Sequence, residues 1–163
     1  MNVAEIMSRE IGCVTADAYA NDGARVMWEC DCGIVPVVDS NEAKRLVGVI
    51  TDRDICMAAY TQGKALCEIP VRSAMSTEVL TCSPEDPVSI AEDRMRSAQI
   101  RRLPVSDAAG RLVGMISLAD IAREAKRPKR AQRPDIEPRE VADTLAGIIE
   151  PRQNAGSAQP LHH

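Results

Sequence analysis

The residues best suited to chemistry are two copies of a glycine, a hydroxyl residue and an aspartate, each spaced three residues apart. The copies are Gly48, Thr51, Asp54 and Gly114, Ser117, Asp120. Each copy follows an apolar stretch and opens a helix-like pattern, so its free N–H groups and positive dipole end favour a phosphate. A hydroxyl can donate to a phosphate oxygen, and a carboxylate can accept from both vicinal hydroxyls of a ribose. The spacing therefore fits a ribose-phosphate.

The same spacing is also the signature of a helix cap. A Ser or Thr followed three residues later by an acid forms a capping box, in which both side chains bond the first helical amides. For one copy taken alone, the cap is the simpler interpretation. The set occurs twice, however, each time beside a proline-containing apolar stretch, and this repetition favours a ligand. Both interpretations stay open.

Two prolines interrupt these apolar stretches, at Pro36 and Pro104. Proline cannot donate to a sheet ladder, so each is expected at a strand edge or a bulge. Backbone groups left free there could bind a purine. A proline that merely protects the edge explains the pattern equally well.

Arg101 and Arg102 precede the second proline stretch, where the first copy has Gly33 and Ile34. Charge-assisted bonds from arginine to phosphate are strong. If a nucleotide lies between the two copies, one cleft gains a guanidinium group near its phosphate and the other does not. The alternative is a solvated arginine pair.

The elements that must position these residues also repeat, with an offset of 68 residues that falls to 66 after the proline stretches. Each copy is expected to be a βαββα unit. In the first copy the predicted strands are 14–15, 34–38 and 45–50, and the predicted helices are 19–31 and 52–62. In the second copy the predicted strands are 79–82 and the two that flank the turn at 107–110, and the predicted helices are 87–99 and 118–126. One such unit exposes an apolar sheet face, which two units can bury against each other. The fold class is α/β (α+β), as one pseudo-twofold pair.

The motifs Val-Pro-Val-Val-Asp, Leu-Val-Gly-Val-Ile-Thr-Asp-Arg-Asp-Ile, Arg-Arg-Leu-Pro-Val and Leu-Val-Gly-Met-Ile-Ser-Leu-Ala-Asp closely resemble tandem cystathionine-β-synthase (CBS) domains. The resemblance covers about residues 1–126 and is best to stand-alone bacterial pairs. It implies a Bateman module with a first motif at 1–66 and a second at 67–126. It also implies an adenosine compound (AMP, ADP, ATP, S-adenosylmethionine or NAD) bound between them.

By this resemblance, Thr51 and Ser117 bind phosphate, Asp54 and Asp120 bind ribose, and Arg102 also contacts phosphate. Ile34 departs from the basic position, so equal occupancy of both clefts is not expected. The full set of expected nucleotide-binding residues is Thr15, Ala16, Val35, Pro36, Gly48, Thr51, Asp54, Thr81, Cys82, Arg102, Leu103, Pro104, Gly114, Ser117 and Asp120. The family commonly forms disc-like dimers, which implies a homodimer.

Composition narrows the class of protein. A net charge of −4 argues against a general nucleic-acid binder. No apolar stretch is long enough for a membrane span, and the N-terminus lacks the apolar region of a signal peptide, so a cytoplasmic location is expected. With no Phe, one Trp and two Tyr, the core must be aliphatic. The six cysteines match no zinc-finger spacing, and no metal site or catalytic nucleophile–base set is apparent.

Residues 127–163 form the third segment, a basic proline-punctuated linker with a helix at 138–149 and an expected disordered end. The helix places Val141, Leu145, Ile148 and Ile149 on one face. The basic cluster of the linker could contact an anionic partner, but a solvated linker is the simpler interpretation.

The leading functional hypothesis is a regulatory, non-enzymatic adenosine-nucleotide sensor that acts on an unidentified protein. One alternative is a ligand-independent dimerisation scaffold. Another is a thiol-based redox sensor that uses Cys30 and Cys32 with Cys13 or Cys82.

Overall fold

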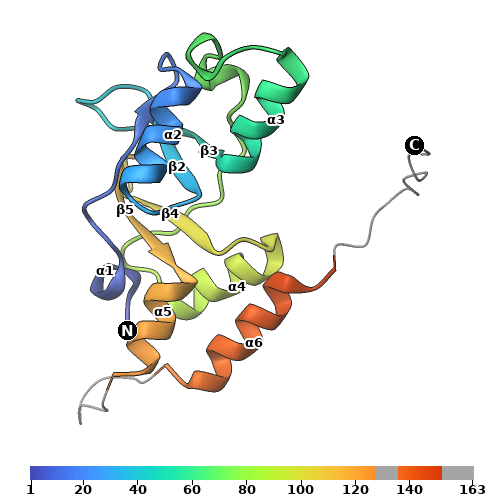
Figure 1. Ribbon diagram of the computed structural model, residues 1–163. Coiled ribbons are helices and arrows are strands. Elements are labelled where there is room, and N and C mark those ends of the chain that lie inside the picture. The colour runs from blue at the N-terminus through green and yellow to red at the C-terminus, as the bar shows by residue number, and fades with distance from the viewer. Residues whose placement is uncertain (128–135, 152–163) are drawn as a thin grey trace, which may run out of the picture.

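Each repeat is an antiparallel hairpin with helices packed on it, as the computed structural model shows for residues 1–127 and 136–151 (Figure 1). The first half contains α1 (Val3–Ile6), β1 (Val14–Thr15), α2 (Ala20–Glu29), β2 (Ile34–Val38), β3 (Leu46–Thr51) and α3 (Asp52–Gln62). Two short 3₁₀ turns, η1 (Leu66–Glu68) and η2 (Val71–Ser73), lead to the second half. That half contains α4 (Val88–Ala98), β4 (Arg102–Ser106), β5 (Leu112–Ser117), α5 (Leu118–Ala125) and α6 (Pro138–Ile149). The predicted helices are confirmed to within two residues at each end.

The two sheets are not equal. The first has the order β1-β2-β3, whereas the second has only β4-β5. The strand predicted at 79–82 is wrong, because this segment makes a single bridge, Cys82 to Val105. The carbonyl of Thr81 accepts a 2.7 Å hydrogen bond from the Arg94 guanidinium and is therefore not used in a ladder.

Pro36 lies in the central strand of its sheet, so of the two positions expected for it, an edge or a bulge, the edge does not apply. The two-residue β1 begins to pair only at Val37, so the missing N–H of Pro36 costs no ladder bond on that side. A register shift follows at once between Val37 and Val38, and an equivalent one lies between Val105 and Ser106. Each proline thus lies one residue before a bulge.

The two hairpins join through their turns. Leu46 N donates to Gly110 O at 3.0 Å, and Leu112 N donates to Lys44 O at 2.8 Å. Arg45 and Arg111 form the bridge between these bonds. The expected pair of βαββα motifs packed through their sheets is therefore confirmed.

The segment that precedes each unit packs on the other unit. Ser8 exchanges two 2.9 Å backbone hydrogen bonds with Met115 of β5, and Ser76 bonds Val49 of β3 in the same way at 3.0 and 2.9 Å. Consequently Val3 belongs to the core of the second unit, and Val71 belongs to the core of the first. Both cores are aliphatic, as the composition requires.

These crossings explain the repeated glycine. A Cβ on Gly114 would lie 2.6 Å from Met7 Sδ and 3.0 Å from Ser8 O. A Cβ on Gly48 would lie 2.9 Å from Ser76 O. The missing side chain therefore admits the backbone of the crossing segment.

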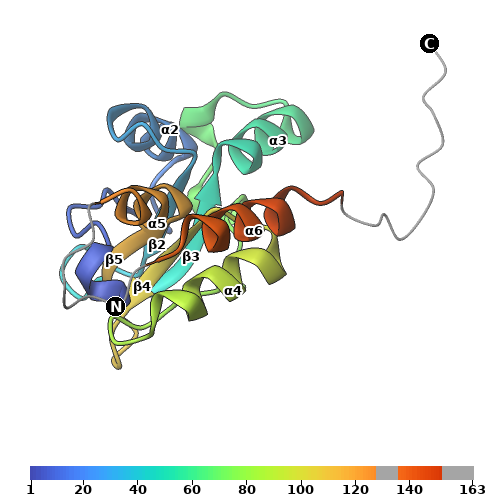
Figure 2. The same ribbon diagram turned by 90° about the horizontal axis from the view of Figure 1, so that it is seen from below.

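Helix α6 lies across α4 and α5 (Figure 2). The sequence placed four apolar residues on one face, and that expectation is wrong. Val141 and Ile148 pack into the core of the second unit, whereas Leu145 and Ile149 are 42% and 68% exposed. Ile148 and Ile149 differ by about 100° around the helix, so both cannot face the core. The basic linker at 128–135 and the end at 152–163 lie outside the described residues.

The contact between α6 and α4 contains a buried carboxyl group. Glu92 is 6% exposed, and Thr144 Oγ1 donates to its Oε1 at 3.4 Å. Burial raises the pKa of Glu92, and the nearby negative charge of Glu140 raises it further. The folded state therefore binds this proton more tightly than the unfolded chain does.

Glu92→Gln is expected to stabilise the protein at about pH 7 by on the order of 1 kcal/mol. The favourable contribution of a carboxyl with a raised pKa is present below its unfolded pKa and is lost as the pH rises through the folded value. The gain should therefore shrink toward about pH 4, where the wild-type group is protonated. Thermal unfolding at both pH values measures it, with the exposed Asp93→Asn on the same helix as control. A lower melting temperature at neutral pH would contradict the assignment.

Candidate functional site

The hydroxyl and carboxylate at the start of α5 form a complete capping box. Asp120 N donates to Ser117 Oγ at 3.2 Å. Ser117 N and Ser117 Oγ donate to Asp120 Oδ2 at 2.8 and 2.5 Å. The extended backbone of Ser117 ends β5 and turns the chain directly into the helix. The capping interpretation is therefore correct, and a ligand role has to be compatible with it.

The first unit has the same box at the start of α3. Asp54 N donates to Thr51 Oγ1 at 3.1 Å, and Thr51 N and Oγ1 donate to Asp54 Oδ2 at 2.9 and 2.7 Å. The two boxes differ at the position three residues after the aspartate. Arg123 pairs with Asp120 Oδ1, whereas the equivalent position after Asp54 is the uncharged Met57.

Ser117 and Asp120 open onto a cavity of about 280 Å³ between the two units. The second unit contributes the start of α5 together with Arg102 and Met115. The first unit contributes Ile34 and Pro36 of β2 and the end of the loop after α2. The crossing N-terminal segment closes one side with Ser8, Glu10, Ile11 and Gly12. The volume is near the lower end of the range for small-molecule sites, about 300 to 1,000 Å³.

The cavity carries charges of both signs. Arg102 and Arg123 are the cations, and Glu10, Asp31 and Asp120 are the anions. Arg102 is paired in register with Ser117, so its side chain starts beside the cap. Burial raises the pKa of Cys32 in the other unit, and the nearby positive charge of Arg102 offsets a small part of that rise. Arginine is thus present at one hydroxyl-carboxylate pair, while Ile34 pairs with Thr51 at the other.

The structure brings only part of the expected set together. Pro36, Arg102, Ser117 and Asp120 line the cavity, together with Ile34, where the first copy departs from the family pattern. Side chains of Val35, Leu103 and Cys82 are buried in the two cores. The remaining expected residues, Thr15, Ala16, Gly48, Thr51, Asp54, Thr81, Pro104 and Gly114, do not line this cavity.

Several cavity residues were missed from the sequence. Glu10, Ile11 and Gly12 reach the site only because the N-terminal segment crosses to the second unit. No local sequence pattern predicts that crossing. Arg123 could have been found, because a basic residue three positions after Asp120 lies on the same helical face.

The cysteines differ sharply in environment. Cys30, Cys56 and Cys67 are exposed, and all six are free thiols. Burial raises the pKa of Cys82 to about 11. Burial also raises the pKa of Cys32, whose Sγ donates to Ile34 O at 3.4 Å.

Alkylation should follow these environments. At about pH 8, iodoacetamide is expected to label Cys30, Cys56 and Cys67 more than about 100-fold faster than Cys82, because the thiolate reacts and Cys82 is almost fully protonated. Peptide mass spectrometry over a time course measures the order. Rapid labelling of Cys82 in the folded protein would contradict its burial.

No helix in the described part of the chain is long and apolar enough to span a membrane. Over the same residues, no group of three or more His, Cys, Asp or Glu side chains could hold a metal ion.

Comparisons with known proteins give the family. The CBS domain model matches residues 3–60 and 71–127. The CBS domain-containing protein YhcV of Bacillus subtilis is 33% identical over 121 residues, which is 74% of this chain and 83% of that protein. Some other curated relatives are longer, and the chain spans 23% and 24% of two of them.

Two solved structures are similar in fold and carry adenosine ligands. The CBS domain pair of protein MJ0100, in complex with 5′-methylthioadenosine and S-adenosyl-L-methionine, is 25% identical with a TM-score of 0.66, over 76% of this chain and 94% of that one. CBSX2 in complex with AMP is also 25% identical with a TM-score of 0.66, over 76% and 95%. Two family matches in tandem, together with the paired βαββα units, place this chain in the CBS domain family.

Proposed function

We propose that the chain is a non-enzymatic regulatory module that binds an adenosine nucleotide or S-adenosylmethionine in the cavity between its two units. The observation that carries the proposal is the meeting of Arg102, Ser117 and Asp120 in one inter-unit cavity. Similar CBS pairs are complexed with AMP and with S-adenosylmethionine.

The carboxylate of Asp120 fits a ribose. Its Oδ2 is used by the cap, whereas its Oδ1 contacts Arg123, whose side chain is 70% exposed. Asp120 itself is only 10% exposed, but the solvated guanidinium of Arg123 limits what this ion pair contributes. A ribose hydroxyl can therefore replace Arg123 at Oδ1 without breaking the cap.

Arg102 and the start of α5 fit a phosphate. In the free chain the Ser117 hydroxyl donates to Asp120, so a phosphate contact from Ser117 would compete with that bond. Among the first N–H groups of α5, Leu118 N already donates to Arg101 O and Asp120 N donates to Ser117 Oγ. The Arg102 guanidinium faces no such competition from the cap, is the stronger donor, and acts beside the positive dipole end of α5. Phosphate recognition in this proposal rests mainly on Arg102.

Isothermal calorimetry and thermal shift with AMP, ADP, ATP, S-adenosylmethionine and NAD test the function. A ligand that binds only the native state must raise its melting temperature. Binding of at least one compound supports the proposal. If none binds and none shifts the melting temperature, the module is a ligand-independent scaffold instead.

The ligand acts by changing the relative arrangement of the two units, because the cavity is built from both and a ligand favours the arrangement it binds better. An unidentified protein reads that arrangement. Free thiols suit a reducing cytoplasm, where we place the module. The raised pKa of Cys82 argues against a thiol-sensor role for that residue.

A further inference from the structure

Arg123 is paired with the oxygen atom that a ribose would use. Its guanidinium contacts Asp120 Oδ1, whereas Asp120 Oδ2 accepts from the N–H and the hydroxyl of Ser117. The side chain of Arg123 is 70% exposed and that of Asp120 is 10% exposed, so the guanidinium covers a largely buried carboxylate from the solvent side. Both residues line the inter-unit cavity. A ribose that binds Oδ1 therefore competes with Arg123 for it.

The other charges of the cavity decide what a displaced Arg123 can bind. The lining contains the guanidinium groups of Arg102 and Arg123 and the carboxylates of Glu10, Asp31 and Asp120. An anionic ligand that met Arg102 alone would face an excess of negative charge. Arg123 follows Asp120 by three residues, so it stays on the same face of α5 after displacement. A phosphate in the cavity is then the partner to which a guanidinium binds most strongly.

Displacement has a different consequence for a ligand that lacks an anionic group. Adenosine has both ribose hydroxyls but no charge, so its binding breaks the ion pair of Arg123 with Asp120 and leaves the guanidinium to water. AMP adds a phosphate monoester, whose charge at about pH 7 is about −1.5 to −2. With AMP, Arg123 exchanges one anionic partner for another. The ribose contact and the phosphate contact are therefore coupled through this residue.

We infer that Arg123 is a specificity-determining residue, which pairs with Asp120 in the free chain and transfers to the anionic group of the ligand when the ribose takes Asp120. The cavity consequently favours adenosine 5′-phosphates over adenosine compounds that have no anionic group. This inference rests on the proposed function, because it requires an adenosine compound in the cavity. Removal of Arg123 should then affect the two kinds of ligand in opposite directions.

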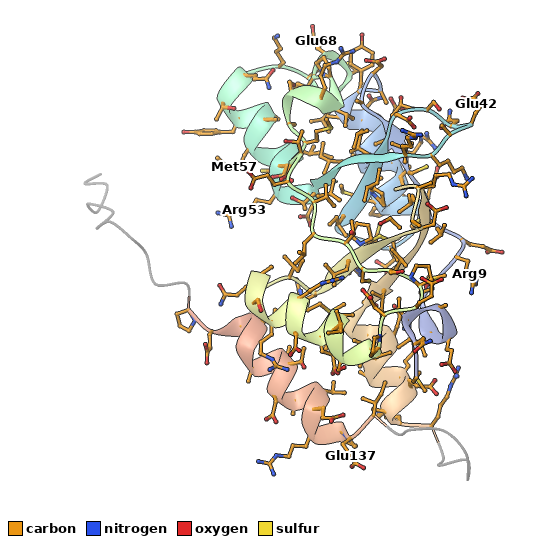
Figure 3. All side chains as sticks on the ribbon, turned by 180° about the vertical axis from the view of Figure 1, so that it is seen from behind. Arg9, Glu42, Arg53, Met57, Glu68 and Glu137 are labelled. Carbon is orange, nitrogen blue, oxygen red and sulfur yellow. The ribbon has the colours of Figure 1, made fainter. Side chains whose placement is uncertain are left out.

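The first unit provides the substitution that tests the role of Arg123. The equivalent residue, three positions after Asp54, is Met57, which is 46% exposed. Met57 and Arg53 project outward from α3 (Figure 3). Methionine has a long unbranched side chain without charge, so it cannot pair with a carboxylate. Arg123→Met thus removes the guanidinium at an exposed position and introduces the residue that the other repeat already has there.

Calorimetry with adenosine and with AMP measures the exchange. Arg123→Met should bind adenosine about 2- to 5-fold more tightly than the wild type, because the competitor for Asp120 is gone and an exposed ion pair is worth little. The same variant should bind AMP about 10-fold more weakly, because the lost contact to phosphate outweighs that gain. Arg123→Lys keeps the positive charge and should retain most of the AMP affinity.

Arg127→Met is the matched control. Arg127 pairs with Glu124 at the same spacing, just after the end of α5, but does not line the cavity. Its substitution should leave both affinities unchanged. Circular dichroism and melting temperature show that the variants fold.

The outcomes separate this inference from the proposed function. Opposite shifts in the affinities for adenosine and AMP support the exchange. If Arg123→Met shifts both affinities in the same direction, or leaves that for adenosine unchanged, the exchange is wrong although an adenosine compound still binds. Binding of S-adenosylmethionine alone by the wild type would likewise overturn only the exchange. If the wild type binds no adenosine compound, the proposed function fails and the exchange fails with it.

Discussion

Asp120→Asn is expected to weaken AMP binding by about 100-fold, because hydrogen bonds to a charged group are worth about 1.5 to 3 kcal/mol each. Asparagine keeps one oxygen, and the N–H and hydroxyl of Ser117 will occupy it as they occupy Asp120 Oδ2 now. The ribose then loses its charged acceptor while the helix cap survives. Calorimetry of the folded variant gives the dissociation constant.

The control for Asp120→Asn removes one negative charge elsewhere. Asp93→Asn lies on α4 at an exposed position away from the cavity and should bind AMP as the wild type does. Equal affinity for Asp120→Asn and wild type would remove the ribose role, even if AMP still binds. If the variant lost both its affinity and its folded state, the result would not test the ribose contact. Asparagine is chosen because it keeps the helix cap and so prevents unfolding.

Gly114→Val is expected to destabilise the protein by about 3 kcal/mol and lower its melting temperature by about 10 °C. The new Cβ would lie 3.0 Å from the backbone oxygen of Ser8, which cannot move without breaking its bonds to Met115. The crossing segment would detach, and with it Glu10 and Gly12 would leave the cavity wall. Calorimetric unfolding measures the stability, and AMP binding should fall with it.

Gly23→Ala is the matched control for the glycine substitution. Its Cβ would lie 3.4 Å from Ile55 Cδ1, an ordinary contact, within helix α2. Because alanine is the better helix former, this change should leave stability unchanged or raise it by about 0.5 to 1 kcal/mol. A melting temperature for Gly114→Val close to that of Gly23→Ala would show that the crossing segment contributes little.

The sequence predicts the local structure well because local structure is set by nearby residues. The hairpins follow from short apolar stretches on either side of turn residues, and the starts of α3 and α5 follow from Thr51 and Ser117 with an acid three positions on. The segment 79–82 misled the prediction, because its apolar and β-branched residues suit a strand while Arg94 takes the carbonyl of Thr81. That competition comes from a residue on another helix and is invisible locally.

The site could be predicted only in part for the same reason. Ser117, Asp120 and Arg102 were identified from their types and spacing, and they do meet at the cavity. Gly114 was expected among the nucleotide-binding residues, whereas a Cβ at this position would meet the backbone of Ser8. The faces of α6 were misassigned because a single apolar face was assumed. Ile148 is buried and Ile149 is exposed, so the two residues lie on different faces of the helix.

Neither half of the chain is self-sufficient, because the arm that fills each core arrives from outside that core's own repeat. Residues before the first repeat finish the second, and residues before the second finish the first. A single repeat of this kind could complete its core in the same way only by exchanging this segment with another molecule. Two repeats in tandem make that exchange intramolecular, at the high effective concentration of a tethered pair. The same interlock means that a break between the repeats would leave two pieces that need each other to fold.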